Sequence, residues 1–425
     1  MSDLPIRRLD DFMAEGAIML GRGDIISKED IEAYPGPYPI YSSSAHNNGK
    51  FGEYGKFMFD EELITWSVDG GGYFFYRDKH QYSVTNVCGY MRIKSQQLYP
   101  KFVFYSLANQ HRFLTFDYTT KAHPSVIKKQ YWLPAISRDY QEKIATILTS
   151  IDTAIEKTEA LIEKYLQIKA GLMQDLFTRG VLPNGQLRPH RDQAPELYQE
   201  TAIGWIPKDW ECEMLGSILS KSGGYLQTGP FGSQLHAHEY QNEGVPVVMP
   251  QDINDGLIGT AFISRISLAR AKLLARHYLK VGDIIIARRG ELSRAAAVNE
   301  SEADWICGTG CFLLRLGKTN LNHFFFSQVY RHDIIQRQVA GMQVGSTMPS
   351  LNNNVMSRLF FPFPDSDEQT QISNRLNVAE EKICSLQNHA KKLQQQKLGL
   401  MQDLLTGKVP VKTESHTSSA TEYKT

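Results

Sequence analysis

The chain has 425 residues, of which 42% are hydrophobic and 22% are charged, and its formal net charge is zero. This length allows two or three globular domains, and the composition is that of an ordinary soluble protein. Zero net charge argues against a dedicated nucleic-acid binder, which is usually basic. We find no apolar run long enough for a membrane helix and no signal peptide. The five cysteines are scattered, which indicates a reducing cytoplasm rather than a disulfide framework.

The first predicted element is a globular domain over residues 1–139. Aromatic and β-branched residues are interrupted there by Gly and Asn, which predicts short strands joined by turns. Residues 77–138 contain ten Lys and Arg against two acidic residues, whereas residues 1–62 contain six against twelve. A fold could gather the basic stretch into a positive surface, although charge runs are commonly no more than solvated faces.

The second predicted element is a long helix over residues 140–180. Its apolar residues step alternately by four and by three, which is the heptad seam of a coiled coil. The seam comprises Ile144, Leu148, Ile151, Ile155, Ile162, Leu172 and Leu176. Lys169 occupies the same seam. Such a lysine either fixes the register of a helix pair or lies near a frayed end and extends its ammonium into water.

A connector rich in Pro, Gly and Gln is expected over residues 181–204, followed by a second β-rich domain over residues 205–365. Residues 281–287 predict a turn that leads into a buried strand. Residues 265–294 form another basic stretch, with eight Lys and Arg against two acidic residues. The two domains begin and end with similar segments and differ in their middles.

A second long helix is predicted over residues 366–407, and it repeats the first. The string Gly-Leu-Met-Gln-Asp-Leu at residues 171–176 recurs unchanged at residues 399–404, which indicates a duplication. Lys397 stands where Lys169 stands in the first copy. The second seam comprises Ile372, Leu376, Ile383, Leu386, Leu393, Leu400 and Leu404. Residues 408–425 contain few apolar residues and are predicted to be a disordered tail.

Together these elements predict an α+β chain. Two β-rich globular domains in a pseudo-two-fold arrangement are separated by two long antiparallel coiled-coil helices. We interpret the helices as spacers, so the function is expected to lie in the domains that they separate.

This order of elements resembles the specificity subunits of type I restriction-modification enzymes over nearly all of residues 1–410. The most specific match is Gly-Pro-Phe-Gly-Ser at residues 229–233, which is typical of the target-recognition domains of that family. Residues 282–285, with Arg288 and Gly290, resemble a recurrent strand motif, and residues 400–407 resemble the family's helix ends. The first domain lacks the Gly-Pro-Phe-Gly-Ser string, which leaves its recognition loops unassigned.

The resemblance implies that each domain reads one half of a split, asymmetric site in double-stranded DNA. It implies that the helices set the spacing between the halves and dock two methyltransferase subunits, and that motor-nuclease restriction subunits join the complex. S-adenosylmethionine, ATP and Mg are then expected on those partner subunits, with no cofactor or metal on this chain. No membrane is implied, and the location is cytoplasmic. A different interpretation is a non-catalytic coiled-coil scaffold whose two β-rich domains bind protein or RNA.

Base readout favours Arg, Lys, Asn and Gln, assisted by Ser and Thr. Candidates were sought in predicted loops bounded by glycine, and for each one a solvent-facing role is the alternative. The first domain offers Ser43, Asn47, Asn48, Lys50, Arg77, Lys79, Lys121 and His123. The second offers Gln227, Ser233, Gln234, Arg288, Arg289, Gln343 and Ser346.

The sequence does not predict a catalytic site. Pro364-Asp365 followed by Glu380-Glu381-Lys382 matches the letters of a nuclease pattern, but Glu380 and Lys382 lie on the heptad helix beside its seam. Cys307 and Cys311 lack a second pair at zinc-like spacing. The motif of amino-methyl transfer is missing as well. The chain is therefore expected to be non-catalytic by itself.

Overall fold

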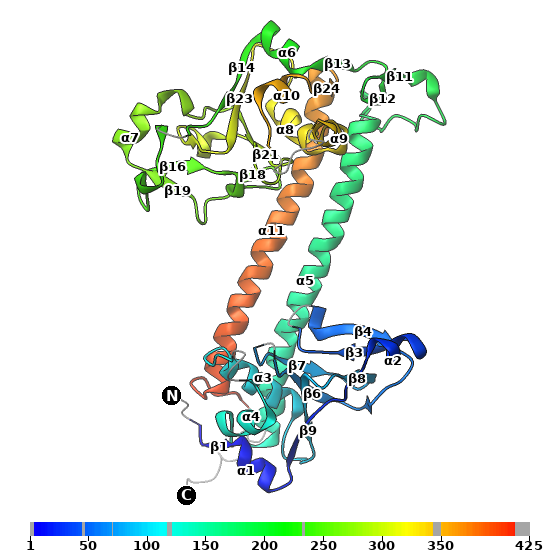
Figure 1. Ribbon diagram of the computed structural model, residues 1–425, viewed down its shortest axis with the longest axis vertical. Helices are drawn as coiled ribbons and strands as arrows, with labels where there is room; N and C mark the ends of the chain where they lie inside the picture. The colour runs from blue at the N-terminus through cyan, green and yellow to red at the C-terminus, as the bar shows by residue number, and fades with distance from the viewer. Residues whose placement is uncertain are drawn as a thin grey trace, which may run out of the picture. The chain divides into compact units, whose positions relative to one another are not determined.

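The computed structural model describes residues 4–44, 47–69, 71–116, 121–231, 234–342 and 350–412. The chain divides into two compact units (Figure 1). Unit 1 comprises residues 1–160 and 387–425, and unit 2 comprises residues 161–386. Each unit therefore contains one of the two β-rich segments and one end of each long helix. These boundaries differ from the predicted ones, which treated the helices as separate elements.

Unit 1 contains two four-stranded sheets. In the first, strands are ordered β2–β9–β6–β7, and every neighbouring pair is antiparallel. The second has the order β4–β3–β8–β5, in which β3 and β8 are parallel. The strands are β2 (Ile18–Arg22), β3 (Tyr38–Tyr41), β4 (Lys50–Tyr54), β5 (Phe59–Asp60), β6 (Leu63–Ser67), β7 (Phe74–Arg77), β8 (Gln81–Val84) and β9 (Cys88–Ile93). The helices of this segment are α1 (Leu9–Ala14), α2 (Lys28–Ala33), η1 (Asn47–Gly49), α3 (Pro100–His111) and α4 (Pro124–Gln130).

Unit 2 repeats the topology of the first sheet and keeps one parallel pair in the second, where that pair lies at the edge of the sheet rather than in its middle. Its first sheet has the order β14–β23–β20–β21, and its second has the order β15–β19–β16–β22 with β16 and β22 parallel. The strands are β14 (Gly223–Thr228), β15 (Tyr240–Gln241), β16 (Val245–Val248), β19 (Ser264–Ile266), β20 (Ile284–Ala287), β21 (Ala295–Ala297), β22 (Ile306–Cys307) and β23 (Cys311–Gly317), with a hairpin of β17 (Ile253–Asn254) and β18 (Leu257–Ile258). The helices are α6 (Leu215–Ser222), α7 (Leu268–Leu273), α8 (His323–Arg331), α9 (Asp333–Gly341) and α10 (Asn353–Ser357), with short turns η2 (Pro195–Leu197), η4 (Ala237–Glu239), η5 (Pro250–Asp252), η6 (Ala275–His277) and η7 (Glu300–Glu302).

A short antiparallel strand pair leads into each long helix. In unit 1, β1 (Ile6–Arg8) pairs with β10 (Trp132–Pro134), and α5 (Arg138–Thr178) follows. In unit 2, β13 (Glu211–Met214) pairs with β24 (Phe360–Phe363), and α11 (Ser366–Leu405) follows. The two long helices have 41 and 40 residues, in agreement with the prediction.

A glutamine in the first turn of each long helix joins that helix to its unit. The side-chain oxygen of Gln141 accepts a hydrogen bond from the amide of Tyr99 at 2.8 Å. The side-chain oxygen of Gln369 accepts one from the amide of Asn322 at 2.7 Å. Because buried amides need hydrogen-bond partners, this pair explains why glutamine recurs at equivalent places of the duplication.

The long helices run antiparallel where they meet inside each unit. In unit 1, Asp152 pairs with Lys397, and Glu159 accepts a hydrogen bond from Gln394 further along α5 but earlier on α11. The seam residues Ile144, Leu148 and Leu404 join the core of unit 1, and Leu176, Ile372 and Leu376 join that of unit 2. All of the predicted seam residues are buried or half-buried.

Each seam lysine pairs with a carboxylate on the opposite helix. In unit 2, Lys169 Nζ lies 3.0 Å from Glu380 Oε1, and Arg331 donates to the same oxygen at 2.6 Å. In unit 1, Lys397 Nζ lies 2.6 Å from Asp152 Oδ1. These contacts favour the register-fixing alternative over a lysine that extends into water.

The connector expected over residues 181–204 is an ordered part of unit 2 rather than an open linker. Arg188 is 3% exposed and donates to Glu368 at 2.5 and 2.8 Å and to Asp209 at 2.6 Å. The strands β11 (Tyr198–Thr201) and β12 (Gly204–Pro207) form a hairpin after it. The sequence pattern missed this because a buried arginine is held by partners that are distant in sequence.

The start of the predicted tail is also ordered, since the amide of Val411 donates to the hydroxyl of Tyr140 at 2.7 Å. Residues 413–425 lie outside the described residues. Among helices of the described ranges, none has the length and apolar character needed to cross a bilayer.

Candidate nucleic-acid interface

In unit 2, several loops meet at one end of the sheet β14–β23–β20–β21. The amide of Gly229, after β14, donates to the carbonyl of Cys311 at the start of β23. The amide of Arg288, after β20, donates to Gly310, and the carbonyl of Arg288 accepts from the amide of Leu351. We call this surface recognition edge 2, and it comprises residues 227–231, 234, 288–294, 308–310 and 350–351.

The glycine of the Gly-Pro-Phe string is required by a close backbone contact. A Cβ atom on Gly229 would lie 1.9 Å from the carbonyl oxygen of Gly308, so no other residue fits without a shift. The hydroxyl of Thr309 donates to the carbonyl of Pro230 at 2.6 Å, which fixes the same turn. The turn leaves the ring of Phe231 57% exposed.

Unit 1 has an equivalent turn that the sequence analysis missed. The amide of Gly23, after β2, donates to the carbonyl of Cys88 at the start of β9. A Cβ on Gly23 would lie 1.9 Å from the carbonyl oxygen of Val84. Ile25 is 78% exposed, and it stands where unit 2 has Phe231. The only sequence signal is a glycine with a serine four residues later, in Gly-Asp-Ile-Ile-Ser at residues 23–27.

Hydrogen bonds gather further loops of unit 1 beside this turn. The hydroxyl of Thr85, which follows β8, donates to the hydroxyl of Ser42 at 3.0 Å, and Ser67 donates to the carbonyl of Ser43 at 2.7 Å. The amide of Ala122 donates to the carbonyl of Val68. We call this surface recognition edge 1, and it comprises residues 22–27, 42–44, 47–49, 67–69, 71–73, 85–87 and 121–123.

Five of the candidates in the first domain lie on recognition edge 1. They are Ser43, Asn47, Asn48, Lys121 and His123, and all except the half-buried Ser43 are exposed. Asn47 and Asn48 have φ angles of 50° and 51°, a left-handed conformation that asparagine tolerates better than most residues. Lys121 forms an ion pair of 3.0 Å with Asp69.

The other three candidates of the first domain are not among the loop residues of this edge. Arg77 is not a loop residue: it is on β7, 2% exposed, and its Nε donates to Thr65 at 3.0 Å. Its guanidinium lies over the ring of Tyr41, and burial lowers its pKa. Lys50 is on β4, where it pairs with Glu53. Lys79 is exposed in the turn after β7, at the end of the sheet opposite recognition edge 1.

Four candidates of the second domain lie on recognition edge 2. Gln227 is on β14, and its amide donates to the carbonyl of Arg276 at 3.0 Å. Gln234 and Arg289 are exposed. Arg288 is half-buried, its Nε donates to the carbonyl of Leu351 at 3.2 Å, and burial, with Arg289 adjacent, lowers its pKa. The remaining candidates, Ser233, Gln343 and Ser346, lie outside the described residues.

The strand motif at residues 282–285 supports the sheet rather than the interface. Asp283 is 1% exposed, and its two carboxylate oxygens accept from Arg315 at 2.6 and 2.5 Å. Unit 1 has the same kind of bidentate pair, in which Arg92 donates to Glu61. Bidentate charge pairs of this geometry hold β23 and β9 to the loops that precede β20 and β6.

The nuclease-like pattern is likewise used for structure. Glu380 is held by Lys169 and Arg331, and Asp365 accepts from the amide of Glu368 at 2.9 Å near the start of α11. In the described part of the chain, no group of three or more His, Cys, Asp or Glu side chains is placed to hold a metal ion.

This duplicated fold is similar to that of known proteins. The sequence matches the family described as the type I restriction modification DNA specificity domain over residues 1–164 and 207–395. It is 23% identical to the MjaVIII specificity subunit of Methanocaldococcus jannaschii over 96% of this chain and 94% of that protein. A putative type I specificity subunit of Mycoplasma pneumoniae is 39% identical over 30% of this chain and 69% of that protein.

The fold is that of a solved type I S subunit from M. genitalium, with a TM-score of 0.63, 18% identity and 97% of each chain covered. Two repeated units that each carry a loop edge define the class of two-domain DNA specificity proteins. The chain belongs to the type I restriction-modification DNA specificity family, and its function is sequence recognition on DNA. The scaffold interpretation, with domains that bind protein or RNA, is not favoured.

Proposed function

We propose that each unit reads one half of a bipartite DNA site through its recognition edge. This proposal rests on one observation: the chain forms the same kind of loop edge in both units. Gly23 and Gly229 anchor equivalent turns on equivalent strands, whereas the polar side chains exposed around them differ. Two edges with one backbone plan and different side chains suit two half-sites of different sequence.

The exposed side chains supply two kinds of contact. Amides such as those of Asn47, Asn48 and Gln234 can bind adenine through paired hydrogen bonds, and Arg289 can bind guanine. Lysines such as Lys121 suit the phosphates, which position a protein without reading sequence. Arg288 is already bonded to Leu351, so we assign it to holding the loop that presents Arg289.

We propose further that the long helices set the spacing between the half-sites. Each helix has one end in each unit, and the ion pairs Lys169–Glu380 and Lys397–Asp152 fix the register of the two helices. A DNA-reading protein whose two readers have fixed spacing recognises half-sites of fixed spacing.

Catalysis is assigned to other subunits of the same system. We propose that two methyltransferase subunits, with S-adenosylmethionine, and motor-nuclease subunits, with ATP and Mg, bind this chain, which is non-catalytic by itself. The use of Glu380 in a buried ion-pair network supports this assignment, because the one nuclease-like pattern of the sequence is thereby committed to structure.

The proposal is tested by selecting bound duplexes from a random pool with the assembled complex. Arg289→Ala should relax the preference at one half-site only and cost about 1–3 kcal/mol of binding there, whereas Lys121→Ala should weaken binding without changing the selected sequence, as expected for a phosphate contact. Lys94→Ala and Lys318→Ala are matched controls, since both lysines are exposed and follow β9 and β23 at the opposite end of each sheet. Relaxation of both halves by one edge variant, or of a half by a control, contradicts the assignment.

A further inference from the structure

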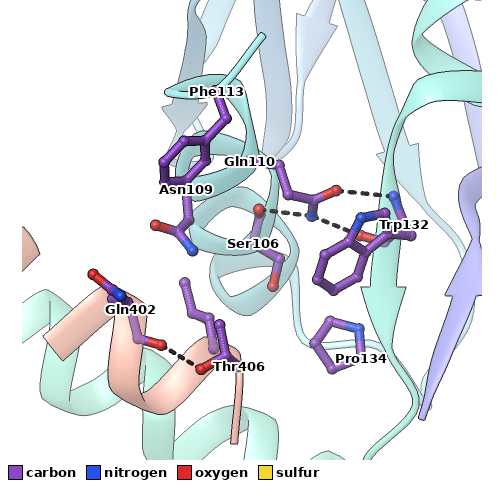
Figure 2. A pocket seen from close by; sticks show the side chains of 9 residues that line it. Ser106, Asn109, Gln110, Phe113, Trp132, Pro134, Gln402 and Thr406 are labelled. Atoms are coloured by element: carbon purple, nitrogen blue, oxygen red, sulfur yellow. Dashed lines mark hydrogen bonds between the residues drawn. The ribbon is translucent and has the colours of Figure 1, made fainter. Parts of the chain in front are cut away.

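A cavity of about 240 Å³ lies in unit 1 between α3, β10 and the end of α11. Figure 2 shows Ser106, Asn109 and Gln110 of α3 on one side, Gln402 of α11 with Thr406 just after that helix on another, and Trp132 and Pro134 of β10 on a third. The ring of Phe113, which also lines the cavity, is 77% exposed. The cavity is therefore amphipathic, with amides and hydroxyls facing rings.

One polar group in this cavity is buried without a partner. Ser106 is 2% exposed, and its hydroxyl makes no hydrogen bond to any described residue. The amide of Gln110, in contrast, is fully used, since it donates to and accepts from the backbone of Trp132. A buried hydroxyl without a partner costs free energy, so it marks a place for a ligand or a water.

Unit 2 shows what fills the equivalent place. Gln174 stands in the repeated string at the position of Gln402, and its side-chain oxygen lies 3.2 Å from Nε2 of His332. The imidazole also lies 5.2 Å from the ring of Phe177. Its Nδ1 accepts from the amide of Ile334, so the ring is neutral and carries its proton on Nε2, which donates to Gln174.

Two residue differences between the repeated units open the cavity in unit 1. Tyr99 and Asn322 are equivalent, because their amides bind equivalent glutamines of the long helices. Counted along the chain from them, Ser106 corresponds to Val329, which is fully buried, and Asn109 corresponds to His332. Smaller side chains in unit 1 thus replace the valine and the imidazole that close this place in unit 2.

We propose that the cavity of unit 1 binds a ring side chain of a partner polypeptide, one that donates a hydrogen bond from its edge as histidine does. The internal example is His332, whose N–H binds the glutamine equivalent to Gln402. The exposed ring of Phe113 at the cavity suits a polypeptide better than a free small molecule, because aromatic side chains anchor protein interfaces. Unit 2 supplies the ring from its own chain, so only unit 1 would use a partner's ring.

The test follows the indole N–H signal of Trp132 in a spectrum of the full chain, which has five tryptophans. The probe is 4-methylimidazole, the analogue of the histidine side chain, added without DNA. We expect a saturable shift of the Trp132 signal. The double variant Ser106→Val/Asn109→His, which copies unit 2, should bind the probe at least tenfold more weakly. No shift, as for a cavity that holds only water, or an equal shift in the double variant overturns the proposal.

Two further variants keep the result independent of folding defects. Gln402→Met removes the acceptor without filling the space and should also lose the shift. Val329→Ser/His332→Asn reproduces the serine and asparagine of unit 1 and should create a second binding equivalent for the probe, which a calorimetric titration counts. An unchanged response in both variants contradicts the site.

The occupant is identified with the assembled complex. The double variant should lower the affinity of a partner subunit at least tenfold, whereas half-site selection on DNA stays the same, so failure here is distinct from failure of DNA reading. Unchanged partner affinity overturns the docking role. If the probe binds only after residues 413–425 are removed, the chain's own His416 or Tyr423 is the occupant of the cavity. That result would overturn the proposal that a partner polypeptide binds there.

Discussion

Lys169 and Glu380 form a buried ion pair of 3.0 Å in unit 2, and its counterpart in unit 1 is the pair of Lys397 with Asp152. Each lysine is on one long helix and each carboxylate on the other, at positions that the duplication relates. A lone polar pair in an apolar seam lowers stability relative to leucine but permits one register only. The duplication has kept this device in both copies.

The two pairs differ in burial, which predicts different costs. Glu380→Gln should lower the free energy of unfolding by about 3 kcal/mol, because Lys169 and Arg331 would remain as buried charges without a carboxylate. Asp152→Asn should cost only about 1 kcal/mol, since the side chains of Lys397 and Asp152 are 27% and 23% exposed. Denaturant unfolding of both variants measures the difference. Equal losses in the free energy of unfolding would show that burial does not determine how much each ion pair contributes to stability.

The anchoring glycines should be sensitive to one added methyl group. Gly23→Ala and Gly229→Ala place a Cβ 1.9 Å from a carbonyl oxygen, which should cost about 1–3 kcal/mol and weaken binding at one half-site each. Gly171→Ala is the control, because nothing lies within 4 Å of its Cβ and alanine favours a helix. Fluorescence anisotropy with a duplex altered in one half-site separates the outcomes. Normal binding by both edge variants would contradict the role of these turns.

Arg288 and Arg289 should behave differently although they are neighbours. Arg289→Ala should cost about 1–3 kcal/mol of DNA binding and leave the melting temperature unchanged, because Arg289 is exposed. Arg288→Ala should lower the melting temperature as well, because its Nε binds the carbonyl of Leu351 and its guanidinium lies over the ring of Phe312. Thermal unfolding without DNA checks this, and identical melting temperatures would count against the distinction.

Stability should fall as the solution becomes acidic. Burial lowers the pKa of His332, so the folded state binds fewer protons than the unfolded state as the pH falls through the ordinary histidine range. The stabilisation is present above about pH 6.5 and is lost below it. His332→Gln should reduce the difference in unfolding free energy between pH 7 and pH 5. An unchanged pH dependence would mean that other groups, such as the buried His277, carry it.

The helices and the duplication could be predicted because their signals are local and periodic. A seam such as Ile144–Leu148 appears in the spacing of single letters, and the repeated hexapeptide fixes the register of the copies. The residues of the DNA interface were harder to predict from the sequence. Asn47 lies in a loop that glycine marks, whereas Arg77 lies on a strand, and its burial follows from Tyr41 and Thr65, which are distant in sequence.

The turn at Gly23 shows most clearly what could not be predicted from the sequence. Its role depends on the carbonyl of Val84, 61 residues later, and no local pattern announces that contact. Only the second copy, in which Gly229 precedes Pro230 and Phe231, resembles a known motif. The duplicated topology then identifies the turn of the first copy.

We propose that the paired helices hold two DNA-reading units at a set spacing, and the length of the helices tests this directly. Inserting one heptad after Ala160 in α5 and one after Leu386 in α11 preserves the seam and lengthens each helix by about 10 Å. Duplexes selected by the resulting complex should have unchanged half-sites with a longer spacer, or no site should be selected. Retention of the original spacer between both half-sites would contradict the account.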